Sequence, residues 1–174
     1  MADEGLASQF KTWLQEHAGA ILKVARAYTL NADDCQDLVQ EILLQAWRSL
    51  PTFEGKASAS TWFYRVALNT ALGWQRKEHY RRIRQQPILE VEDASVAGSD
   101  SAQQAAQRET IERLYHAIRQ LPKTDAALVL LYLEDLSYRQ IAEVLGISES
   151  NVGVKLNRAK KALGELLKET CDES

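Results

Sequence analysis

The sequence predicts an all-α fold of two small helical domains joined by a flexible linker, with a helix-turn-helix in the second domain. Apolar residues recur at helical spacing along most of the chain, and no stretch alternates as a half-buried strand would. A chain of 174 residues has room for one ordinary domain or two small ones. We expect one domain over residues 1–85, a flexible acidic linker over 86–107 and a second domain over 108–174.

The first domain should contain three helices, over Leu6–Leu30, Ala32–Leu50 and Ser60–Tyr80. Asn31 and the segment Pro51–Gly55 separate them, and both are typical of helix ends. Each segment repeats its apolar residues at the spacing of one helix face, so the three helices should pack together as a small bundle.

The segment between the two halves differs in composition. From Pro87 to Ala106 it has no aromatic residue, and its acids are Glu90, Glu92, Asp93 and Asp100. Such a polar segment is typical of a flexible linker. A short additional helix is the competing interpretation, because alanines and glutamines fill its second half.

The second domain should begin near Arg108 with a helix that runs to Gln120. Leu121-Pro122 breaks it, a further helix continues to Leu133, and two short helices follow around Gly146.

The last two helices have the pattern of a helix-turn-helix. Ser137 and Ser148 are each placed to cap a helix, and Gly146 stands where a left-handed residue ends the first one. The apolar positions of the two helices are Ile141, Val144, Leu145, Val152, Leu156, Ala159 and Leu163. Their spacing leaves one seam on each helix to face the core.

The opposite face of the second of these helices is polar and basic. It carries Ser150, Asn151, Val154, Lys155, Asn157, Arg158 and Lys161. Cations suit phosphates, while Asn and Arg suit base edges, so this pattern is typical of a recognition helix. The alternative is an ordinary helical hairpin with a solvated basic face. Gly153 in this helix costs about 1 kcal/mol relative to Ala, which a close approach to the DNA backbone would explain.

The helix that begins at Ala32 should expose one leucine. Its core side is formed by Cys35, Leu38, Val39, Ile42, Ala46 and Leu50. Leu44 falls almost opposite, with Trp47 at the border, among Asp37, Gln40, Glu41 and Arg48. Leu44 is either incidentally exposed or the apolar anchor of an interface for a basic partner.

The third helix places adjacent aromatic residues, Trp62, Phe63 and Tyr64, before a basic segment. From Arg65 to Arg84 there are six basic residues and one acid. Neighbours on a helix are about 100° apart, so at least one of the three rings should lie on the surface. Rings beside cations suit single-stranded nucleic acid. The alternative is that Trp62 and Phe63 are core residues and Tyr64 is merely exposed.

The composition of the chain excludes several classes of protein. Lys plus Arg number 21 and Asp plus Glu 24, a net charge of −3, which excludes a uniformly basic nucleic-acid coat but not a local basic face. The longest apolar run, Ala126–Leu133, has eight residues, and a membrane span needs about 20, so we expect no membrane insertion. The acidic start of the chain lacks a signal pattern, and we expect a cytoplasmic protein.

The residues that most often bind metals or catalyse reactions are few and scattered. Cys35, Cys171, His17, His79 and His116 have no ligand spacing. Phosphate-binding loops, serine-hydrolase elbows and zinc-protease motifs are absent from the sequence. We therefore expect no catalytic site, no metal and no cofactor.

Three segments of the chain match motifs of a known family. The stretch DDCQDLVQE from Asp33, followed by Ala46-Trp47, is similar to the motif D-x-x-D-L-V-Q-E-x-F-L-x-A-W. Phe53-x-Gly55 and STWFYRVALN from Ser60 are similar to F-x-G-x-x-S-F-x-T-W-L-Y-R-I-A-x-N. With Leu121-Pro122 and LSYRQIAEVLGIS from Leu136, which resemble the family's carboxy-terminal domain, the chain resembles the extracytoplasmic-function sigma factors of the sigma-70 family.

The resemblance implies a factor without catalytic activity that binds core RNA polymerase, its clamp helices through region 2 and its flap through region 4. The positions matching the clamp-binding helix are Asp37, Gln40, Glu41, Leu44, Trp47 and Arg48. Promoter DNA would be bound as duplex and, once melted, as single strand. The resemblance also implies an anti-sigma partner that covers the same surfaces.

For the −10 element the expected residues are Phe53, Ser60, Thr61, Trp62, Tyr64, Arg65, Asn69, Arg76 and Lys77. For the −35 element they are Ser148, Ser150, Asn151, Val154, Lys155, Asn157, Arg158 and Lys161. The recognition helix departs from the common family pattern at Asn151 and at Gly153-Val154, so the −35 sequence cannot be copied across. The alternative from another class is a stand-alone helix-turn-helix regulator, which would not need the surface around Leu44.

Overall fold

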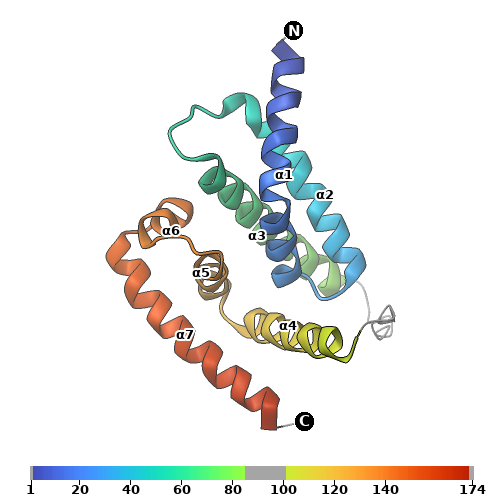
Figure 1. The fold of residues 1–174 in the computed structure, drawn as a ribbon, viewed down its shortest axis with the longest axis vertical. Coiled ribbons are helices and arrows are strands. Elements are labelled where there is room, and N and C mark those ends of the chain that lie inside the picture. Colours follow the sequence, from blue (N-terminus) through green and yellow to red (C-terminus); the bar gives the residue numbers. More distant parts are fainter. Residues whose placement is uncertain (1, 85–100, 173–174) are drawn as a thin grey trace.

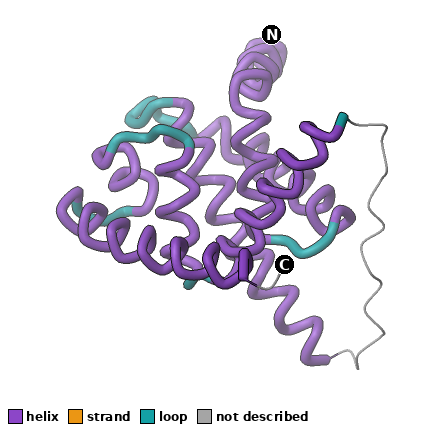
Figure 2. Tube along the Cα trace, turned by 60° about the horizontal axis from the view of Figure 1, so that its bottom comes forward, coloured by secondary structure: helices purple, strands orange, loops and turns teal. Residues whose placement is uncertain are grey.

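The computed structural model describes residues 2–84 and 101–172, which form seven α-helices and one 3-10 turn (Figure 1). No strand occurs within these two ranges (Figure 2). The elements are α1 (Ala2–Tyr28), α2 (Ala32–Ser49), η1 (Leu50–Thr52), α3 (Ala59–Arg84), α4 (Ala102–Gln120), α5 (Lys123–Leu133), α6 (Tyr138–Leu145) and α7 (Glu149–Asp172). The all-α prediction is confirmed.

Helices α1, α2 and α3 form the first bundle, as the periodicity predicts. The Asn31 side chain starts α2 by accepting a hydrogen bond from the Asp34 amide at 2.7 Å. Ser58 does the same for α3, accepting from the Thr61 amide at 3.1 Å. These caps satisfy amides that have no partner inside the helix. The side chains buried between the helices include Ile21, Val24, Leu38, Ile42, Ala46, Phe63, Ala67 and Ala71.

The second bundle contains α4 to α7, and its first helix begins inside the segment expected to be a linker. Ser101 and Gln104 form a reciprocal capping box, so α4 begins at Ala102. The prediction of a flexible linker is therefore wrong for residues 102–107, where the competing helical interpretation holds. Residues 85–100 of the expected linker lie outside the described part. The last helix, α7, has 24 residues and is not short as expected.

The helix-turn-helix forms where the sequence predicts it. Ser137 caps α6 in a capping box with Gln140, and Gly146 ends α6 in the left-handed conformation, with φ 68°. The Ser148 hydroxyl accepts a hydrogen bond from the Asn151 amide at 3.3 Å, which caps α7. Each of these three predicted signals is confirmed, because each acts through neighbours within a few residues.

The two bundles pack against each other. α6 lies against α3, and α4 lies against the end of α1, while α7 is on the far side of the second bundle from α2 (Figure 1). The Tyr28 hydroxyl donates to the Lys123 carbonyl at 3.0 Å. Arg119 donates to the carbonyls of Arg26 and Thr29 at 3.1 and 3.2 Å. Buried side chains of both bundles join in one apolar cluster, so the described halves form one body.

Candidate functional site

The outward side of α2 carries an apolar pair among charged and polar side chains. Leu44 and Trp47 keep 41% and 39% of their surface exposed. The opposite side buries Leu38, Ile42 and Ala46. The side chains around the pair are Asp37, Gln40, Glu41 and Arg48. The prediction that Leu44 faces away from its own core is confirmed, and these six residues are called the α2 surface below.

An aromatic cluster joins the start of α3 to α1 and to the preceding loop. Phe63 is buried at its centre. Trp62 is half-buried and lies 5.9 Å from the Trp13 ring and 5.5 Å from the Phe53 ring. Phe53 also meets Trp13 edge-on at 5.2 Å. Of the three adjacent aromatic residues, Trp62 is therefore the one that retains access to solvent. Phe53, in the loop before α3, is also half-buried.

Two of the expected −10 residues are buried instead of exposed. Tyr64 keeps only 6% of its surface and Thr61 only 1%. Thr61 is covered at the helix start, where the Ser58 hydroxyl lies 3.0 Å from its own hydroxyl. Tyr64 is covered by the second bundle. In this arrangement of the two bundles both side chains have little surface left for a base, and their contact with the −10 element stays a prediction.

Tyr64 belongs to a polar cluster that crosses between the bundles. Its hydroxyl donates to Glu134 Oε2 at 3.0 Å, and Lys23 of α1 pairs with the other oxygen of the same carboxylate. Burial raises the pKa of Tyr64 far above its ordinary value, and the Glu134 carboxylate raises it further. The phenol therefore stays protonated and donates its hydrogen bond. One residue further on, Arg65 donates to the main-chain carbonyl of Glu143 in α6. Acceptors of the second bundle thus occupy two donors expected to contact DNA.

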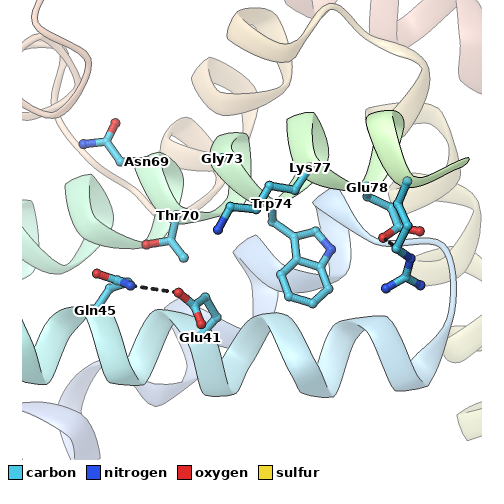
Figure 3. A pocket seen from close by; sticks show the side chains of 9 residues that line it. Glu41, Gln45, Asn69, Thr70, Gly73, Trp74, Lys77 and Glu78 are labelled. Atoms are coloured by element: carbon cyan, nitrogen blue, oxygen red, sulfur yellow. Dashed lines mark hydrogen bonds and ion pairs between the residues drawn. The ribbon is translucent and has the colours of Figure 1, made fainter. Parts of the chain in front are cut away.

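A groove of about 450 Å³ lies between α2 and α3 (Figure 3). Its lining residues are Glu41, Gln45, Asn69, Thr70, Gly73, Trp74, Lys77, Glu78 and Arg81. Thr70 and the Trp74 indole point from α3 toward α2, where Gln45 donates to Glu41 at 2.8 Å (Figure 3). The expected −10 residues Asn69 and Lys77 line the groove together with Glu41 of the α2 surface, and the Asn69 side chain is directed away from α2 (Figure 3).

Most of this groove was not expected from the sequence. Thr70, Trp74, Lys77 and Arg81 recur at helical spacing on one face of α3, and that signal was available in the sequence. Ser60 is half-buried and Arg76 lies on the same helix, and neither belongs to the lining.

The polar face of α7 is open. Val152, Leu156 and Ala159 are fully buried against the bundle, as predicted. The exposed side chains of the opposite face are Ser150, Asn151, Val154, Asn157, Arg158 and Lys161, while Lys155 is half-buried. Ser148 is exposed before the helix and caps it. The predicted face is confirmed as a surface, and its contact with DNA stays a prediction.

Two basic side chains of α7 are held by α5. Arg158 Nη2 lies 3.5 Å from Oδ1 of the buried Asp125. Lys160 Nζ lies 3.4 Å from the centre of the Tyr132 ring. Both contacts restrain a long side chain that would otherwise move freely.

Gly153 lies beside the Tyr138 ring of α6. A Cβ at this position would lie 3.4 Å from that ring, which is an ordinary van der Waals contact. An alanine would therefore fit here, and the close approach of the DNA backbone expected from the sequence stays a prediction.

The described residues contain no group of three His, Cys, Asp or Glu side chains placed to hold a metal ion. Burial raises the pKa of the half-buried Cys35 thiol, an effect that Thr29 and two nearby arginines oppose. The Cys171 side chain lies outside the described part. Within that part, no helix combines the length and apolarity needed to cross a membrane.

Comparisons with known proteins agree on one family. The family model described as "Sigma-70 region 2" matches residues 8–82, and that described as "Sigma-70, region 4" matches residues 111–163. The RNA polymerase sigma-H factor of Pseudomonas aeruginosa is 35% identical over 84% of this chain and 80% of its own length. The ECF RNA polymerase sigma factor SigX of Bacillus subtilis is 30% identical over 77% of this chain and 72% of its own.

A solved structure has the same fold. The sigma factor RpoE of Bartonella quintana, crystallised in complex with the anti-sigma factor NepR, aligns over 92% of this chain and 97% of its own, with 22% identity and a TM-score of 0.67. The chain thus belongs to the sigma-70 family of RNA polymerase sigma factors, in the extracytoplasmic-function group. Its regions 2 and 4 are those of a factor for promoter recognition and transcription initiation.

Proposed function

We propose that the α2 surface is where this factor binds core RNA polymerase, at the clamp helices. The observation that supports this most is Leu44, an apolar side chain turned to solvent on a helix whose opposite side buries Leu38, Ile42 and Ala46. Apolar anchors ringed by charged residues are typical of binding hot spots. The acids Asp37 and Glu41 suit a basic partner.

The −10 element would be bound along α3 and the groove beside it. The half-buried Trp62 and Phe53 offer ring faces to unpaired bases, and Asn69 and Lys77 offer an amide and a cation. Extruding a base costs a few kcal/mol, so holding unpaired bases favours the open duplex by differential binding. Tyr64 and Arg65 would join this surface only after α5 and α6 separate from α3.

The −35 element would be bound by α7 in the major groove of the duplex. Asn151 and Arg158 would contact base edges, and Val154, with 73% of its surface exposed, would meet a thymine methyl group. Lys161 would contact phosphates. Residues 1–85 would act as region 2 and residues 108–174 as region 4, which also binds the polymerase flap.

We assign no catalytic activity to the chain, and place it in the cytoplasm with the polymerase. An anti-sigma factor would inhibit it by covering the α2 surface. The alternative, a stand-alone helix-turn-helix regulator, leaves that surface without a role.

Binding of the purified chain to core polymerase tests the proposal. Leu44→Arg should weaken binding by more than about 1 kcal/mol, because an anchor is replaced by a charge. The matched control is Leu22→Arg on α1, where the leucine has a similar exposed fraction of 48% but lies outside the α2 surface. Both variants should unfold at the same urea concentration as the parent. Normal binding by Leu44→Arg, or equal losses in both variants, would contradict the assignment.

A further inference from the structure

We propose that Asp125 is a positioning residue for promoter selectivity, because it orients Arg158 toward the −35 base edges; this rests on the proposed role of α7. Asp125 lies in the first turn of α5 and Arg158 near the middle of α7, so the pair joins two helices of region 4. The two side chains meet at 3.5 Å, between Asp125 Oδ1 and Arg158 Nη2.

Asp125 is an unusual core residue. Three polar or charged residues are buried in the described part of the chain, Thr29, Thr61 and Asp125, and Asp125 alone among them carries a charge. A buried carboxylate costs free energy unless a cation or hydrogen-bond donors compensate it. Arg158 supplies the opposite charge. The arrangement therefore couples the core of region 4 to a side chain on its DNA-facing surface.

The two ends of the pair differ in exposure. The Asp125 side chain keeps 9% of its surface and the Arg158 side chain 69%. One guanidinium nitrogen thus lies against the buried carboxylate while most of the Arg158 side chain remains in solvent. Its fork is planar and has five N–H donors, so restraining one nitrogen limits the positions that the others can take. Guanine needs two such donors, for O6 and N7.

The position of Arg158 on α7 agrees with the rest of the proposed interface. Asn151, Val154 and Arg158 follow one another at spacings of three and four along α7, and all three are exposed. Residues at these spacings share one helix face. The contact with Asp125 keeps the Arg158 side chain near the face of α7 that carries Asn151 and Val154.

Lys160 is a second basic residue of α7 that can be compared with Arg158. It too is held by α5, over the Tyr132 ring. An ammonium is a point charge without a fork, so holding it fixes no base pattern. Freeing Lys160 should change binding to all sequences alike, whereas freeing Arg158 should change the preference at one base pair.

Asp125 could act differently, by stabilising α5 alone. An acid in the first turn of a helix interacts favourably with the helix dipole. In that role Asp125 would affect folding and leave sequence selectivity unchanged. Selectivity therefore separates the two roles.

The experiment uses the full chain with core polymerase and a library of promoters that differ at the −35 element. We expect Arg158→Ala to lower discrimination at one base pair by about 5- to 150-fold, the range for a bidentate contact. Asp125→Asn should lower discrimination at the same base pair by about tenfold, within that range. The double variant should match Arg158→Ala. Tyr132→Leu, the control, should leave discrimination at that base pair intact.

The possible outcomes distinguish a failure of the positioning role of Asp125 from a failure of the proposed role of α7. If Arg158→Ala weakens all promoters evenly, base reading by Arg158 fails and the positioning role fails with it. If Arg158→Ala is selective while Asp125→Asn changes only the urea midpoint, the positioning role alone is wrong. Asp125→Glu covers the case in which Asp125→Asn does not fold. It keeps the charge but displaces the carboxylate by one methylene, so selectivity at that base pair should again fall, and full selectivity would overturn the inference.

Discussion

Replacing Glu134 with leucine should loosen the packing of the two bundles without unfolding either. The Glu134 carboxylate, with 16% of its side chain exposed, accepts from Tyr64 and pairs with Lys23, both in the first bundle. A leucine side chain has no acceptor and could satisfy neither partner.

The structure sets the size of the effect. Leaving the buried Tyr64 hydroxyl unpaired costs about 1–3 kcal/mol. The Lys23 side chain is 51% exposed, so its ion pair adds less than about 1 kcal/mol. A sum near 2 kcal/mol multiplies the ratio of open to closed molecules by about 30.

Single-molecule energy transfer measures that ratio. One dye would be placed on α2 at Gln36 and the other on α7 at Glu165, in a chain whose Cys35 and Cys171 are replaced by serine. The control is Glu143→Leu, because Glu143 contacts Arg65 through its main-chain carbonyl and not its carboxylate. If Glu134→Leu leaves the ratio where the Glu143→Leu control leaves it, this polar cluster does not hold the bundles together.

Three further outcomes are expected. His17 is 17% exposed beside Phe63, and burial lowers its pKa below 6.5 despite the opposing Glu16 charge. The free energy of unfolding should thus have its full value above about pH 6.5 and fall as the pH decreases. His17→Gln should flatten this pH dependence in urea titrations, and an unchanged profile would contradict the prediction. Gly146→Ala should lower the free energy of unfolding by about 1 kcal/mol, because φ is 68°; no loss would mean the turn adapts. Lys161→Ala should reduce the slope of log K against log salt by about 0.9 equally across −35 variants, and an unchanged slope would exclude a phosphate contact.

Features set by neighbours along the chain could be predicted from the sequence. Ser137, Gly146 and Ser148 act within three or four residues, and each is confirmed. The exposure of Leu44 follows from helical geometry alone.

Features set by distant contacts could not be predicted. Tyr64 is buried by packing between the two bundles, and Glu134, 70 residues away, accepts its hydrogen bond. The Asp125–Arg158 pair likewise requires α5 and α7 to be side by side, which periodicity does not specify.

Transcription reconstituted from core RNA polymerase, the purified chain and a genomic promoter library tests the central claim most directly. Transcripts should start at promoters that share one −35 and one −10 element, should require the chain, and should be lost with Leu44→Arg but not Leu22→Arg. Sequence-specific binding of the chain to duplex DNA without any chain-dependent transcript would instead indicate a stand-alone regulator and contradict the account.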